Sequence, residues 1–133
     1  METNIKIRKN WLKGMYLYTA FGSGITGLGI LIMPKTTASV WNLPIQEPII
    51  FGIAGSVFLA FSLISIFGLV NPLKFASVLL LQMFYKIIWF IGLIFPLLIK
   101  GQLPEYALII IIIFATYIIG DVIAIPFKYL LRK

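Results

Sequence analysis

The chain alternates long apolar runs with short polar breaks. Four apolar runs can be marked, at about residues 15–33, 49–70, 75–99 and 105–131. Each reaches the roughly 17–25 residues that an α-helix needs to cross a bilayer. The breaks between the runs hold the Pro, Asn, Gly and Lys residues that are typical of turns. The pattern predicts an all-α integral membrane protein, a four-helix bundle with antiparallel up-down topology.

Composition supports a single membrane domain over residues 1–133. The chain is 61% hydrophobic and its mean hydropathy is +1.06, whereas ordinary globular domains are about 45–50% apolar. A soluble protein of this size could not bury that much apolar surface in one core, so the first expected partner is the lipid bilayer. The net charge of +7 is explained by loop residues that meet anionic headgroups, and no nucleic-acid partner is expected.

Charge placement predicts the orientation. Eight basic residues lie in the terminal segments and in the turn between the second and third runs: Lys6, Arg8, Lys9, Lys13, Lys74, Lys128, Arg132 and Lys133. The other side carries only Lys35 and Lys100, balanced by Glu47 and Glu105. Because cytoplasmic loops carry an excess of Lys and Arg, we expect both termini on the cytoplasmic side, in the inner membrane of a bacterium.

A rival interpretation makes the first run a signal peptide that is cleaved at Thr37–Ala38–Ser39. Its apolar stretch is longer than the usual h-region of about 7–15 residues. Pro34 and Lys35 also stand before the cleavage site. We therefore favour a membrane span.

Small residues at four-residue spacing mark expected helix contacts, because small side chains let transmembrane helices approach closely. The first run has Thr19, Ser23 and Gly27, and the second has Gly52, Ser56 and Ala60. The two ladders predict packing of the first span against the second. The alternative is a seam between two copies of the chain.

The third and fourth runs carry an intramembrane polar site. A lysine at the middle of a span costs about 2.5–3.5 kcal/mol on insertion scales, so such residues tend to face a protein interior. Spacings of three, four and seven residues place the polar and aromatic side chains of the third run on one helix face. The predicted site comprises Gln82, Tyr85, Lys86 and Trp89 from the third run, and Tyr117 and Asp121 from the fourth.

The short connection between these runs predicts their register. It sets Gln82 level with Asp121 and Lys86 level with Tyr117, so Lys86 and Asp121 are offset by about one turn, or 5–6 Å. We expect a Lys86–Asp121 ion pair, either direct or through Tyr117, Gln82 or water. Such a pair can fix the helix register or form a ligand or ion site. The third alternative is that the lysine snorkels to the interface, or that the fourth run ends earlier and leaves Asp121 near the cytoplasmic interface.

Other chemistry is sparse. The chain has no Cys and no His, which removes thiol nucleophiles and imidazole bases or ligands. Glu47 and Glu105 lie beside prolines at helix starts, where an acidic residue complements the helix dipole, so no metal site and no catalytic residue are assigned. The cofactor stays unknown. Aromatic residues at the span ends, Trp41 among them, are expected in interfacial belts, whereas the mid-span Trp89 is a candidate for lining a cavity.

The order of features over the first two-thirds of the chain resembles the DoxX-like superfamily of small four-helix membrane proteins. The residues that carry the resemblance are Gly22 through Gly29 closing on Met33–Pro34, Leu43–Pro44, Gly52–Ile53–Ala54–Gly55 and Ile66–Phe67–Gly68–Leu69. The resemblance implies a compact bundle. It also implies a link, for some members, to quinone-dependent redox systems.

Three classes of function fit the residues. The first is a small polytopic protein without evident catalytic machinery that binds a lipophilic molecule, of lipid or quinone type, or serves as a subunit of a membrane complex. The second is a small proton- or ion-coupled transporter or channel subunit that uses Lys86 and Asp121. The third is a membrane enzyme acting on a lipid, sterol or quinone. We favour the first, because catalytic residue types are lacking.

Overall fold

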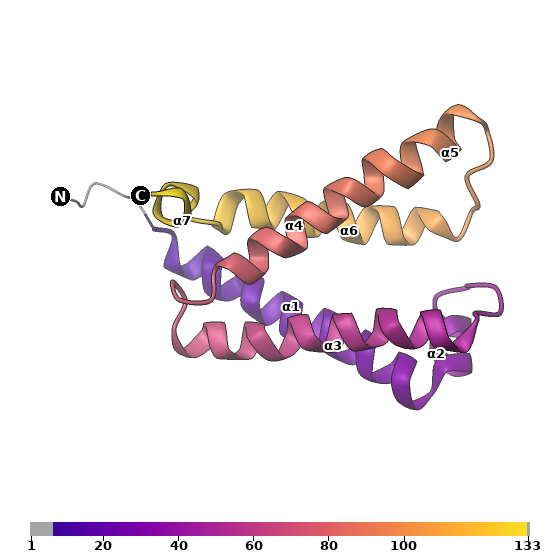
Figure 1. Ribbon diagram of the computed structural model, residues 1–133, viewed down its shortest axis with the longest axis horizontal. Coiled ribbons are helices and arrows are strands. Elements are labelled where there is room, and N and C mark those ends of the chain that lie inside the picture. The colour runs from indigo at the N-terminus through magenta and orange to yellow at the C-terminus, as the bar shows by residue number, and fades with distance from the viewer. Residues whose placement is uncertain (1–6, 133) are drawn as a thin grey trace.

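The computed structural model describes residues 7–132 of the chain and is all-α (Figure 1). Its helices follow the apolar runs of the sequence, with short additional helices near the breaks. The elements in chain order are α1 (Lys9–Ile32), α2 (Pro34–Val40), α3 (Pro48–Val70), α4 (Ser77–Trp89), the π-helix η1 (Phe90–Ile94), α5 (Phe95–Ile99), α6 (Ala107–Ala124) and α7 (Phe127–Leu131).

Four helical segments are long and apolar enough to cross a membrane. They are Lys9–Ile32, Pro48–Val70, Ser77–Ile99 and Ala107–Ala124. Large apolar side chains project outward from them, such as Ile25 on α1, which is 70% exposed. An exterior of this kind would be unstable in water but is suited to lipid. The structure thus supports an integral membrane protein.

The long helices form two antiparallel pairs, α1 with α3 and α4 with α6 (Figure 1). Successive long helices alternate in direction, so α1 begins and α7 ends at the same end of the molecule. At that end the two pairs lie close together. They diverge toward the opposite end, where α2, α5 and the 41–47 and 100–106 loops lie. We call these the closed end and the open end.

Prolines set several of the breaks. α1 ends at Ile32, and Pro34 then begins the short helix α2, which the hydropathy pattern does not predict. In the third span Pro96 lacks the N–H that an α-helix would donate to Gly92, and the widened π-turn η1 lies directly before it. A π-turn absorbs such a missing hydrogen bond without ending the helix.

Two predicted boundaries need correction. The fourth span does not continue to Leu131, because α6 ends at Ala124. Ile125 is extended, as expected for the residue before Pro126, and α7 is a separate short helix. The first span begins earlier than predicted, at Lys9.

α1 packs most extensively against α3, through glycines that bring the two backbones together. A Cβ atom at Gly27 would lie 2.6 Å from the carbonyl oxygen of Gly55 and 2.7 Å from the amide nitrogen of Leu59. Nearby, the Ser62 hydroxyl donates to the Ala20 carbonyl at 2.7 Å. These contacts show a close crossing of the kind that small residues permit.

The predicted ladder on the second span is not part of this crossing. Ser56 and Ala60 are exposed, and no atom lies within 4 Å of a Cβ built on Gly52. Ser56 instead donates back to the Gly52 carbonyl at 2.9 Å within its own helix. The contact row of α3 includes Gly55, which lies on a different face of the helix.

Candidate functional site

The closed end is sealed by packing around Tyr16. Its side chain is fully buried, and its hydroxyl donates to the Pro72 carbonyl at 2.5 Å. Gly68 of α3 lies against the Tyr16 ring, and Gly120 of α6 lies against the Met15 side chain, so neither position has room for a Cβ atom. These contacts hold α1 against α3 and α6 at the closed end, directly beside the candidate site.

A buried polar layer lies next to the packing around Tyr16. Thr19, Gln82 and Asp121 are all 0% exposed and come from α1, α4 and α6. The Gln82 amide nitrogen lies 3.1 Å from an Asp121 carboxylate oxygen and 3.2 Å from the Thr19 hydroxyl. The Thr19 hydroxyl and the Gln82 amide oxygen are 3.3 Å apart. One amide therefore links three helices, in line with the predicted register of Gln82 and Asp121.

Lys86 occupies a separate, aromatic environment. The side chain is 1% exposed, and its Nζ donates to the Tyr85 hydroxyl at 2.7 Å. Nζ also lies 4.2, 4.7 and 4.5 Å from the ring centroids of Tyr85, Phe114 and Tyr117. An ammonium within about 6 Å of a ring face is attracted to it, more strongly when water is excluded. The three rings form a cage around the lysine.

The expected direct ion pair is not formed. In the part of the chain that the structure describes, no hydrogen bond or ion pair joins Lys86 to Asp121, because Lys86 bonds to Tyr85 and Asp121 to Gln82. Tyr117 does not bridge them by hydrogen bonding either, since its hydroxyl donates to the Tyr18 carbonyl at 3.0 Å. The lysine and the aspartate thus belong to two neighbouring groups of contacts.

A stacked tyrosine pair fixes the Tyr117 side of the cage. The Tyr18 and Tyr117 rings are 4.0 Å apart and nearly parallel, at 2°. The Tyr18 hydroxyl shares a hydrogen bond of 2.7 Å with the Thr116 hydroxyl. Gly22 lies directly against the Tyr117 hydroxyl, so any side chain at that position would displace it. The glycine-rich face of α1 thereby makes room for an α6 tyrosine.

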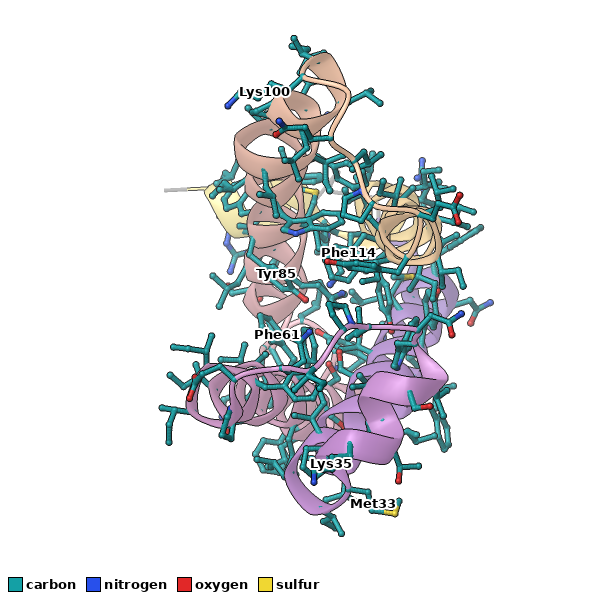
Figure 2. The ribbon with its side chains drawn as sticks, turned by 90° about the vertical axis from the view of Figure 1, so that its right-hand side faces the viewer. Met33, Lys35, Phe61, Tyr85, Lys100 and Phe114 are labelled. Atoms are coloured by element: carbon teal, nitrogen blue, oxygen red, sulfur yellow. The ribbon has the colours of Figure 1, made fainter. Side chains whose placement is uncertain are left out.

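A cavity of about 260 Å³ opens above the cage, between the two helix pairs. Figure 2 is viewed from the open end and shows Tyr85, Phe61 and Phe114 gathered between the helices. The cavity runs from the level of Tyr18 to that of Ile30 along α1, about 18 Å at 1.5 Å per residue. Most of its lining is apolar. The residues with polar atoms are Tyr18, Ser23, Thr26, Thr37, Trp41, Tyr85, Lys86 and Tyr117.

The structure brings most of the predicted polar site together but divides it. Tyr85, Lys86 and Tyr117 line the cavity, whereas Gln82 and Asp121 form the layer beside it. Trp89 does not line the cavity, but its ring packs 4.8 Å from Phe114 and supports that wall.

Sequence reasoning missed three contributors to the site. Phe114 lies three residues before Tyr117 and seven before Asp121, a spacing that places it on the same face of α6. Tyr18 gave no comparable signal. Trp41 lines the cavity near its outer end, where the sequence suggested only an interfacial belt.

Glu47 has a structural role at the start of α3. Its carboxylate accepts the backbone N–H groups of Ile50 at 2.8 Å and Ile49 at 3.0 Å. These two hydrogen bonds lower the pKa of the Glu47 carboxyl group from its ordinary value. Within residues 7–132 there is no group of three or more His, Cys, Asp or Glu side chains that could hold a metal ion.

Comparisons with known proteins give no relative from which a function could be transferred. No family model matches the chain, and neither the search of curated proteins nor that of solved structures finds a match. The resemblance to the DoxX-like superfamily therefore remains a prediction from sequence. Any functional argument depends on the site itself.

Proposed function

We propose that the protein is a small polytopic membrane protein that binds a lipophilic molecule in the cavity between its two helix pairs. The observation that carries this proposal is a largely apolar cavity with a buried lysine at its inner end. Ligand sites are typically apolar hollows of roughly 300–1,000 Å³ with a few placed polar groups. At about 260 Å³ this cavity is slightly smaller than that range, and its lining has that composition.

The packed aromatic walls at the inner end of the cavity support binding rather than a packing defect. Its inner end is held by the Tyr18–Tyr117 stack and by the cage around Lys86. Tightly packed interiors rarely leave an open space of this size without an occupant or a function.

A cavity-filling substitution tests this proposal. Ala54 lines the cavity from α3, whereas Ala60 is exposed on the same helix and makes a matched control. The protein would be purified in mild detergent and its bound molecules identified by native mass spectrometry. We expect Ala54→Trp to lose a bound species that the wild type and Ala60→Trp retain. Equal occupancy in all three proteins would contradict the proposal.

We also propose that both termini face the cytoplasm, so that the open end faces outward. The support is the charge distribution along the sequence, with eight basic residues in the terminal segments and in the turn between the second and third spans, against two in the connections on the other side. Because the chain has no cysteine, single cysteines can be introduced into a clean background. A membrane-impermeant maleimide should label Gln102→Cys but not Asn10→Cys in intact cells. The reverse pattern would overturn the orientation.

The transport and enzyme hypotheses remain predictions. Both need Lys86 and Asp121 to exchange a proton or to act on one substrate, yet the two residues have separate partners here. A role as a subunit of a membrane complex is compatible with ligand binding. A pull-down under the same detergent conditions would identify such partners.

A further inference from the structure

The Lys86 ammonium has unused hydrogen-bonding capacity where it meets the cavity. An ammonium group carries three donors, and within residues 7–132 the only hydrogen bond from Nζ goes to the Tyr85 hydroxyl. The ring faces around it offer attraction but no oxygen acceptor. A buried cation is stabilised best by a partner of opposite charge that also accepts its hydrogen bonds.

Asp121 accepts no hydrogen bond from Lys86 and does not line the cavity. Its carboxylate is fully buried, accepts from Gln82 and lies in the polar layer with Thr19. It does not belong to the cavity lining, whereas Lys86 does. Lys86 is the one charged residue among those that line the cavity. An occupant would therefore meet a single positive group at the inner end.

The rest of the lining favours one hydrocarbon chain. Apolar and aromatic side chains from all four long helices surround the space, among them Phe51, Phe58, Ile110 and Ile113. A volume of about 260 Å³ suits one chain better than the two chains of a diacyl lipid. The length of the cavity, about 18 Å along α1, also matches an extended chain that reaches from the cage toward α2.

We propose that the cavity takes a single-chain lipophilic anion whose carboxylate or phosphate binds the Lys86 ammonium, with the chain extending toward the open end. This inference rests on the proposed function and specifies its ligand class. The carboxylate of a fatty acid and the phosphate of a single-chain lipid offer the same chemistry to Nζ. Hydrogen bonds between such charged groups are stronger than those between neutral groups.

Binding of matched probes to the purified protein in nonionic detergent tests this inference. The probes are oleate, oleyl phosphate and the neutral oleyl alcohol, which share an eighteen-carbon chain and differ in headgroup. Because the apolar binding energy of the chain is about the same in all three, differences in affinity report on the headgroup. We expect the anions to bind about ten- to a hundredfold more tightly than the alcohol. A preference for one anion over the other supports the inference and identifies the source of the charge.

Three variants separate the lysine from general charge effects. Lys86→Met should reduce the preference for anions to near unity, whereas Lys86→Arg, which keeps the charge, should retain most of it. Lys100→Met removes a charge at the exposed open end and should leave the preference unchanged. If Lys86→Met does not fold, the comparison of probes on the wild type and on Lys86→Arg still decides the question.

The outcomes distinguish failure of the anion inference from failure of the proposed lipophilic-ligand function. Equal binding of oleyl alcohol and oleate, both lost in Ala54→Trp, would overturn the anion inference but leave the proposed function standing. Binding of none of the probes would overturn this ligand class. Combined with equal occupancy of wild type and Ala54→Trp by co-purifying molecules, it would overturn the proposed function as well.

Discussion

Substitution of Gly27 by alanine tests the close crossing of α1 and α3. The added Cβ would lie 2.6 Å from the Gly55 carbonyl oxygen and 2.7 Å from the Leu59 nitrogen. Ordinary van der Waals contact begins near 3.4 Å, and both obstructing atoms belong to the backbone. The two helices must therefore separate or shift. Overpacking of this kind costs about 1–3 kcal/mol.

Gly52→Ala provides the matched control on α3. It is the same chemical change inside a helix, but no atom lies within 4 Å of the new Cβ. Both variants gain the higher helix propensity of alanine, about 0.5–1 kcal/mol. The variants should therefore differ by roughly 1–3 kcal/mol, with Gly27→Ala the less stable.

Thermal unfolding of the two variants and the wild type in one detergent measures this difference. Gly27→Ala should unfold below the wild type, because the steric cost outweighs the gain in propensity. Gly52→Ala should unfold at or above the wild type. If the two variants were equally stable, the proximity of Gly27 to the α3 backbone would be refuted.

Three further predictions concern separate parts of the structure. Asp121→Leu should destabilise the fold by about 1–3 kcal/mol, because it leaves the Gln82 amide donor without its acceptor. Asp121→Asn should cost less, and unfolding measurements on both variants check this. Tyr16→Phe should cost about 0.5–1.5 kcal/mol through loss of the bond to Pro72, and no change in its unfolding midpoint would contradict that contact. The Glu47 carboxyl should titrate below its ordinary pKa, so its stabilising effect is present at neutral pH and is lost as the pH falls through the lowered value. An NMR titration should show this shift, and an ordinary Glu pKa would disprove the cap.

Much of the fold follows from the sequence because lipid imposes simple rules. Apolar length specifies the four spans, and turn residues mark where they end. The boundaries that differ depend on local backbone effects, such as the extended Ile125 before Pro126. The short helix α2 follows Pro34 in a segment that the hydropathy pattern marks only as a break.

The packing faces were harder to predict. A four-residue spacing identifies a row of small residues, but it does not show whether that row of α3 faces a partner. Gly52 fits such a row, whereas Gly55 has Phe51 and Leu59 at four-residue spacing, yet it is Gly55 that meets α1. The choice depends on the rotation of the helix, which the whole crossing determines.

The sequence indicated some residues of the candidate site but not how they pair. Helical spacing grouped Gln82, Tyr85 and Lys86 on one side of the third span, and the short loop set their expected level relative to the fourth. Opposite charges suggested that Lys86 would reach Asp121. The structure instead satisfies Asp121 with a neutral amide and surrounds Lys86 with rings. Side-chain rotamers decide between these two arrangements, and the spacing of residues along a helix does not determine the rotamers.

The cavity was beyond prediction from the pattern alone. It arises because the two helix pairs meet at one end and diverge toward the other (Figure 1). The separation of the pairs at the open end depends on the crossing angles of several helices. Close contacts such as those at Gly27 and Gly22 determine these angles. Only the presence of Lys86 within the span indicated that a site was there to find.

Locating a bound chain directly would test the central claim most sharply. A crystal structure of the protein with a bromine-labelled fatty acid would show the bromine by its anomalous scattering. The account predicts a bromine peak inside the cavity, between Phe58 and Ile110, with the carboxylate at Lys86 and no such peak in Ala54→Trp. Bromine peaks confined to the lipid-facing surface of the helices, with the cavity free of the chain, would contradict it.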